Sequence, residues 1–181
     1  MAAQFVGYRL TSEREQKLIL FAEGRDAASL ASISAPDCAP CHFWAGINRA
    51  LYGEASGIFR AFATLGIVRQ NLTRAAELDP SYAHGGPHRI LGLIDQKLPG
   101  ILGGSNSDAV QHFEKAIAAA PDNPLNYLFL AQLYRDEYKD EAAVRQVWER
   151  SQKKVRLPPA SEIESMEAWN ELKELGASVQ K

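Results

Sequence analysis

Residues 84–134 read HGGPHRILGLIDQKLPGILGGSNSDAVQHFEKAIAAAPDNPLNYLFLAQLY, and this stretch decides the fold. Its apolar residues recur at intervals of three and four, which is the spacing of an amphipathic helix. Pro and Gly stand between the apolar segments and separate one helix from the next. Val, Ile and Thr do not gather into the alternating runs that a sheet needs, here or elsewhere in the chain. The sequence therefore predicts an all-α fold.

Helix breaks recur along the chain with a regular period. They stand at Asp79-Pro80, at Pro121-Asp122 and at Val155 to Pro158, about 40 and 35 residues apart. Small residues such as Gly92 and Ala131 let antiparallel helices approach closely, while large ones such as Tyr127 and Phe113 fill the space between helix pairs. This pattern predicts a right-handed superhelix of about three tetratricopeptide-like helix pairs with a flanking helix at each end.

The expected organisation has three parts. Residues 1–37 form an N-terminal helical extension, in which the helical pattern runs from Ser12 to Leu30. Residues 38–155 form the repeats, divided at about 41–80, 81–121 and 122–155. Residues 156–181 form an amphipathic helix that caps the open end of the array. A second role for this helix, as an interface between copies of the chain, is left open.

Local signals place two of the expected helix starts. The segment KLPGILGGSNS reads as a Pro/Gly loop, and it ends with Ser105, Asn106 or Ser107 as the N-cap of the next helix. Asn123 followed by Pro124 is the N-cap and first residue of the helix that begins the third repeat.

Residues from about Cys38 to Lys153 resemble a family of divergent tetratricopeptide proteins, typified by the periplasmic T component of TRAP-type transporters. The segments that carry the resemblance are CHFWAGINRALYGEA, AAELDPSY and the string GGPHRILG…LPG…GGS…A..HFEKA, in this order. The resemblance implies an exported helical array, often lipid-anchored. It also implies that the protein binds a partner protein or a small ligand and performs no chemistry.

Composition excludes several classes of function. The chain has 181 residues, of which 46% are hydrophobic and 23% charged, with a net charge of -2 and a pI near 6.1. A slightly acidic protein is not expected to bind nucleic acid or an anionic membrane. No apolar run reaches the roughly 18 residues that a membrane span requires. No signal peptide is visible, which leaves either a cytoplasmic protein or a mature exported one whose signal was removed. The resemblance favours a periplasmic or exported protein, with a cytoplasmic one as the alternative.

Both cysteines lie in the sequence Cys38-Ala-Pro-Cys41-His42, which has the spelling of a c-type haem attachment site. One reading is a single haem c with His42 as the proximal iron ligand; the distal ligand would be one of His84, His88 or Met166. The favoured reading has no cofactor: the two cysteines cap a helix, as a local disulfide in an exported protein or as thiols in a cytoplasmic one. Zinc is a weaker reading because a fourth ligand is distant. A thioredoxin-like enzyme lacks its βαβ context.

The sequence contains no recognisable catalytic motif. There is no G-x-S-x-G, no P-loop and no H-E-x-x-H. We therefore expect a non-enzymatic binding or adaptor protein, with an electron carrier bearing haem c as the alternative.

The three expected repeats, 41–80, 81–121 and 122–155, together form what we call the repeat frame. This frame predicts a candidate binding groove, because the first helix of each tetratricopeptide pair lines the concave face. Three arginines, two glutamines and a tyrosine fall on that face: Arg49, Tyr52, Arg89, Gln96, Gln132 and Arg135. Arginine offers planar paired donors for carboxylates, so a small carboxylate ligand or an acidic peptide segment of a partner protein is expected there. The alternative is that these residues are ordinary solvated polar groups.

Overall fold

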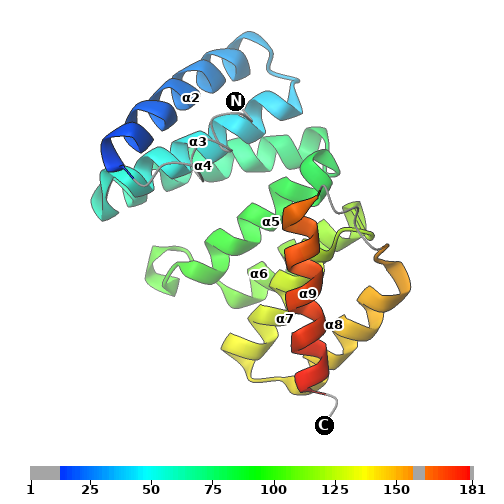
Figure 1. Ribbon diagram of the computed structural model, residues 1–181. Helices are drawn as coiled ribbons and strands as arrows, with labels where there is room; N and C mark the ends of the chain where they lie inside the picture. The colour runs from blue at the N-terminus through cyan, green and yellow to red at the C-terminus, as the bar shows by residue number, and fades with distance from the viewer. Residues whose placement is uncertain (1–12, 157–161, 180–181) are drawn as a thin grey trace. The chain divides into compact units, whose positions relative to one another are not determined.

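The computed structural model describes residues 13–156 and 162–179, and within these ranges every regular element is a helix (Figure 1). The predicted all-α class is confirmed. The chain forms two compact units, Met1–Tyr82 and Ala83–Lys181. No helix in the described ranges combines the length and the apolar character needed to cross a membrane.

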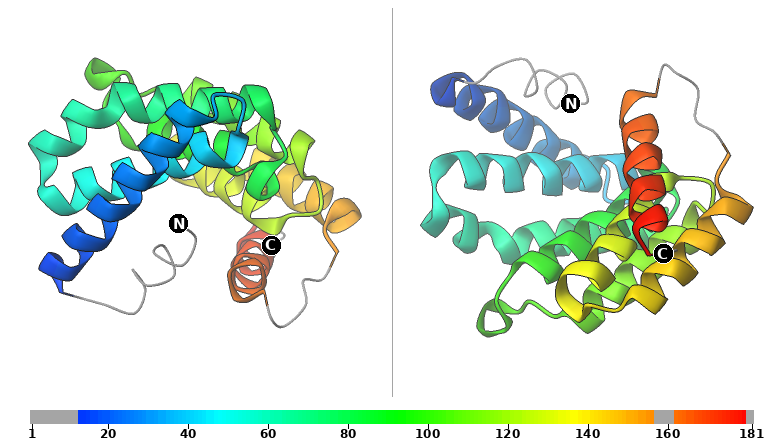
Figure 2. Two further views of the ribbon diagram at one scale, coloured as in Figure 1. Left: turned by 90° about the horizontal axis from the view of Figure 1, so that it is seen from above. Right: turned by 60° about the horizontal axis from the view of Figure 1, so that its bottom comes forward.

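The first unit contains α2 (Arg14–Ser34), α3 (Ala39–Ser56) and α4 (Ile58–Leu78). Helix α3 packs against both α2 and α4, and it runs antiparallel to α4 (Figure 2). The core of the unit is formed by fully buried apolar side chains: Phe21, Ala28, Val68, Leu72 and Ala75.

Two glycines of the first unit permit the close contact of α3 with α4. A Cβ atom at Gly46 would lie 3.0 Å from Cγ of Leu72, so this glycine sets the distance between the helices. Gly57, with a φ of 113°, ends α3 and starts α4 in a conformation that residues with a side chain rarely adopt. The turn between the two helices is therefore a single residue.

The second unit contains the remaining helices. They are α5 (Tyr82–Lys97, whose first residue belongs to the first unit), η1 (Gly100–Leu102), α6 (Asn106–Ala119), α7 (Pro124–Leu133), η2 (Tyr134–Tyr138), α8 (Glu141–Lys154) and α9 (Ile163–Ser178). Helix α7 contacts α6, α8 and α9 and lies at the centre of the core. The largest side chains of that core are fully buried: Phe113, Tyr127, Leu130, Leu133 and Leu172.

Both predicted helix starts are confirmed. Oγ of Ser105 accepts the backbone N–H of Asp108 at 3.2 Å and caps α6, so Ser105 is the N-cap among the three candidates. Oδ1 of Asn123 accepts the N–H of Leu125 at 2.9 Å, and Pro124 is the first residue of α7.

The C-terminal helix α9 packs against α7 and α8, with Leu172 and Leu175 buried and Ile163 exposed. Self-association through this helix stays a prediction. The expected domain boundaries and the right-handed superhelix also stay predictions, because the superhelix would require helix pairs from both units to stack in one array. Helix α2 lies in the same unit as α3 and α4. Residues 1–12, 157–161 and 180–181, which include the ends of the expected extension and of the expected cap, lie outside the described residues.

Candidate functional site

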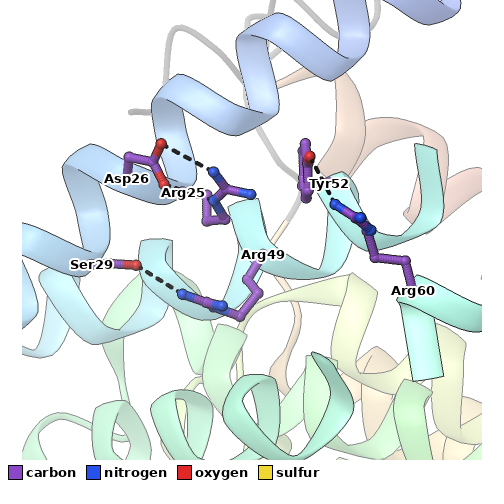
Figure 3. Close-up of polar contacts among 6 residues, drawn as sticks. All are labelled: Arg25, Asp26, Ser29, Arg49, Tyr52 and Arg60. Carbon is purple, nitrogen blue, oxygen red and sulfur yellow. Dashed lines mark hydrogen bonds and ion pairs between the residues drawn. The ribbon is translucent and has the colours of Figure 1, made fainter. Parts of the chain in front are cut away.

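The candidate site lies in the first unit, where arginines of two helices lie beside one tyrosine of a third and a further arginine reaches Ser29 (Figure 3). Arg25 comes from α2, Arg49 and Tyr52 come from α3, and Arg60 comes from α4. We call these four residues the arginine–tyrosine cluster. Arg49 and Tyr52 are three positions apart on a helix, so they share one face of α3.

Two guanidinium groups contact Tyr52. Cζ of Arg25 lies 4.3 Å from the centroid of the Tyr52 ring, which is a close cation–π contact. Cζ of Arg60 lies 5.9 Å from the same centroid, and its Nη1 donates to the tyrosine hydroxyl at 3.3 Å. The hydrogen bond with Arg25 is the main reason why the pKa of Tyr52 is lowered from its usual value, and the charge of Arg60 adds to it.

Arg25 also holds a carboxylate of its own chain. Its Nε and Nη2 donate to the two carboxylate oxygens of Asp26 at 2.7 and 3.0 Å. This paired contact lowers the pKa of Asp26 and raises that of Arg25. The side chain of Asp26 is 69% exposed and that of Arg25 is 24% exposed, so the pair lies at the protein surface. The geometry of this pair is that of carboxylate recognition by arginine.

Arg49 contributes a further guanidinium, and only some of its N–H donors have hydrogen-bond partners. Its Nη2 donates to Oγ of Ser29 on α2 at 3.2 Å, and its Nε is buried without a hydrogen-bond partner. A buried donor without an acceptor is costly.

Two cavities lie in the same unit. The first has a volume of about 450 Å³ and is lined by Arg14, Lys17, Phe21, Leu51, Glu54, Ala55 and Gly57. The second has a volume of about 540 Å³ and is lined by Ser32, Ile33, His42, Arg69, Gln70, Asn71, Thr73, Arg74 and Glu77. Both linings contain basic and acidic side chains, so the surface of this unit is polar beside the cluster as well.

Arg89, which the repeat frame places on the groove, makes three hydrogen bonds within the second unit. Its guanidinium donates to the backbone carbonyls of Ala83 and His84 at 3.3 and 3.0 Å and to Oδ1 of Asn126 at 2.8 Å. Burial lowers its pKa to about 10, so it stays charged at neutral pH. Ala83 and His84 have positive φ angles, and Arg89 thus stabilises an unusual turn at the start of α5. These contacts are structural, and binding by Arg89 stays a prediction.

The other three predicted groove residues also lie in the second unit. Nε2 of Gln132 donates to Glu171 of α9 at 2.6 Å, and Arg135 holds the adjacent Asp136 with paired contacts of 2.6 and 2.8 Å. Gln96 is half-buried on α5. Because Arg49 and Tyr52 belong to the first unit, a groove shared by all six residues stays a prediction.

The sequence reasoning missed Arg25 and Arg60. Arg25 lies on α2, before the first repeat, and Arg60 lies near the start of α4, outside the helix from which the groove residues of the first repeat were taken. No signal in the sequence alone marks them, because both contacts with Tyr52 arise from the packing of α2 and α4 against α3.

Cys38 and Cys41 are joined by a disulfide, and both ring nitrogens of His42 have partners. Nδ1 of His42 lies 3.2 Å from Oδ1 of Asn71, and Nε2 lies 3.0 Å from the carbonyl oxygen of Pro36. The cavity beside His42 is lined mostly by polar side chains. A c-type haem would take both thiols and one imidazole nitrogen and would need an apolar pocket, so it would require the disulfide and a contact of His42 to be broken. The haem alternative stays a prediction.

The three candidate distal ligands are placed as follows. Met166 is half-buried on α9. His84 is exposed, and Nδ1 of His88 lies 3.2 Å from Nδ1 of His112. Nε2 of His112 in turn lies 3.7 Å from the buried carboxylate of Asp95. Among the described residues, no cluster of three or more His, Cys, Asp or Glu side chains is arranged to hold a metal ion.

Comparison with known proteins gives one family. A family model described as the TRAP transporter T-component matches residues 5–161, which is most of the chain. A comparison with curated proteins finds no match.

Proposed function

The chain belongs to the TRAP transporter T-component family, and from this premise we propose that it is a non-catalytic binding component whose arginine–tyrosine cluster takes a carboxylate group. The carboxylate belongs to a small ligand or to an acidic segment of a partner protein. The proposed location is the periplasmic side of the envelope, and the disulfide between Cys38 and Cys41 is typical of such an oxidising compartment.

The observation that carries this proposal is the arrangement around Tyr52. Guanidinium groups of α2 and α4 meet one tyrosine ring of α3, with Cζ at 4.3 and 5.9 Å from its centroid. Asp26 already forms paired hydrogen bonds with Arg25 at 2.7 and 3.0 Å. The cluster therefore binds one carboxylate within the chain, and it carries more positive charge than that carboxylate neutralises.

Arginine suits this task better than lysine because its planar group binds both oxygens of a carboxylate at once. The Tyr52 ring holds the Arg25 guanidinium in place, which lowers the entropy lost on binding. Arg49 adds a buried Nε that has no acceptor. The rest of the molecule is slightly acidic, so an anionic ligand is directed to this surface by local charge rather than by net charge.

The proposal is tested by calorimetric titration of the full chain with a short poly-glutamate peptide. We expect binding that weakens as salt is added, because exposed charges are screened. Replacing Arg25 or Arg49 with Ala should lower the affinity at least about tenfold, the equivalent of one charged hydrogen bond.

Arg156→Ala is the matched control, because it removes one positive charge from an exposed residue beyond α8. It should leave the affinity within about twofold, since distant surface charges act weakly. Equal losses in all three variants would show binding by net charge alone and contradict the proposal. Absence of binding by the native chain would contradict it as well.

A further inference from the structure

The disulfide between Cys38 and Cys41 is a second feature with chemistry of its own, and it is independent of the proposed carboxylate site. The two cysteines are three positions apart, and they form the N-terminal turn of α3. Cys38 is the N-cap residue of that helix, and Pro40 lies within its first turn. Both cysteines are partly exposed, so solvent reaches the bond.

The helix start favours a negative charge on one of these sulfurs. The backbone N–H of Cys41 donates to Sγ of Cys38 at 3.2 Å. An N–H donor and the positive end of the helix dipole both stabilise a thiolate over a thiol. In the reduced chain, Cys38 should therefore carry the thiolate.

The turn does not depend on the disulfide for its shape. The N–H of Cys38 donates to the carbonyl of Ala35 at 3.1 Å, and the N–H of His42 donates to the carbonyl of Cys38 at 3.2 Å. The side chain of His42 lies 3.0 Å from the carbonyl oxygen of Pro36. A disulfide that closes such a short loop also removes little entropy from the unfolded chain. The protein can thus lose the bond and keep its fold.

We propose that Cys38 and Cys41 form a reversible redox site that exchanges with small thiols and disulfides, with Cys38 as the nucleophile. In the oxidising direction the Cys38 thiolate attacks a small disulfide, RS–SR. A bond forms between Sγ of Cys38 and one sulfur, and RS⁻ leaves and takes a proton from water.

The second step restores the protein disulfide. The thiol of Cys41 loses its proton to water, and the resulting thiolate attacks Sγ of Cys38. The protein disulfide forms, and the second RS⁻ leaves and is protonated. The protein dithiol is oxidised, and one small disulfide is reduced to two thiols. Excess thiol drives the same steps in reverse.

This site differs from the oxidoreductase that the sequence argues against. A thioredoxin-like enzyme binds its protein substrates on a βαβ scaffold, and the described residues contain no strand. We therefore expect exchange with small thiols but no reductase activity on insulin.

The first test measures alkylation of the reduced, folded chain by iodoacetamide at neutral pH, with mass mapping of each cysteine. Cys38 should react at least about tenfold faster than Cys41, because a thiolate is the reactive form. In concentrated urea the two rates should converge, since the helix is lost. Equal rates in the folded chain would overturn the assignment of Cys38.

The second test equilibrates the native protein with excess reduced glutathione and traps its thiols. A redox-active pair should become mostly reduced while the helical circular dichroism stays unchanged. A pair that stays oxidised would be a structural disulfide, which resists glutathione, and would overturn the proposal. Cys38→Ser and Cys41→Ser serve as single-thiol references, and neither should alter binding of the poly-glutamate peptide.

Discussion

The guanidinium of Arg25 lies over the ring of Tyr52, with 4.3 Å between Cζ and the ring centroid, and this contact joins α2 to α3. It brings polar side chains of two helices together. It also connects Tyr52, which the sequence analysis placed in the candidate groove, with Arg25, which it did not.

The first prediction concerns the ionisation of Tyr52. Its pKa is lowered chiefly by the hydrogen bond with Arg25, so the hydroxyl should ionise at lower pH than an ordinary tyrosine. Arg25→Ala should raise that pKa toward the usual value, while Arg156→Ala should leave it unchanged. The measurement is an ultraviolet titration of each variant, with Tyr52→Phe as the reference that lacks this transition. An identical titration curve for the native and Arg25→Ala chains would refute the contact.

The second prediction concerns Arg89 and stability. Removal of its side chain leaves three acceptors without this donor: the backbone carbonyls of Ala83 and His84 and Oδ1 of Asn126. Arg89→Ala should lower the free energy of unfolding by about 3 kcal/mol, because partly buried charged hydrogen bonds are lost. Arg89→Lys should not restore it, since an ammonium cannot reproduce the planar fork.

Urea unfolding followed by circular dichroism gives these values. Arg156→Ala, at an exposed site, should change the free energy of unfolding by less than about 0.5 kcal/mol. A loss of the same small size at Arg89 would mean that the turn at Ala83–Gly85 is stable without it.

The third prediction concerns His88 and acid. Burial, followed by the charges of His112 and Lys115, lowers the pKa of His88 to about 4. The unfolded chain binds this proton near the usual value of 6.5, so it holds more protons than the folded chain between the two values. Stability contributed by neutral His88 is therefore complete above pH 6.5 and declines as the pH falls toward 4.

His88→Gln should flatten this part of the stability profile, measured as unfolding free energy at pH 7 and pH 5. His84→Gln is the control, because His84 is exposed. The carboxylate of Asp95, 3.7 Å from His112, is present in all these variants and its effect cancels. If His88→Gln and the native chain lost equal stability, protonation of His88 would not be the cause.

The fourth prediction compares two glycines. A Cβ at Gly92 would lie 2.7 Å from the ring of Phe113, which is fully buried and has no room to shift. Gly92→Ala should cost about 1–3 kcal/mol through overpacking. Gly66 is exposed on α4 with nothing within 4 Å of the added carbon, so Gly66→Ala should stabilise by up to about 1 kcal/mol. Thermal unfolding of the two variants should therefore shift in opposite directions. Shifts in the same direction would contradict the close approach of α5 and α6.

The sequence predicted those features that depend on local chemistry. Ser105 and Asn123 cap helices because their side-chain oxygens reach free N–H groups, and this needs only nearby residues. Gly92 likewise indicates a close helix contact, because a residue without a side chain lets a neighbouring helix approach and its identity is read directly from the sequence.

Features that depend on distant partners could not be predicted in this way. The repeat frame assigned Arg89 to a ligand surface, and nothing local to it indicates that its guanidinium also donates to Ala83, His84 and Asn126, the last of which is 37 positions away. The positive φ angles at Ala83 and His84 are unusual for residues with side chains, so no propensity indicates them. Arg25 became part of the site only because α2 packs beside α3.

The most direct test of the central claim follows the arginine side chains themselves by NMR. The Nε–Hε signals of the full chain are recorded while the poly-glutamate peptide is added at low salt. The account predicts saturable shifts at Arg25, Arg49 and Arg60, and reversal of those shifts by added salt. Shifts confined to Arg89 and Arg135 of the second unit, or no shifts at all, would contradict it.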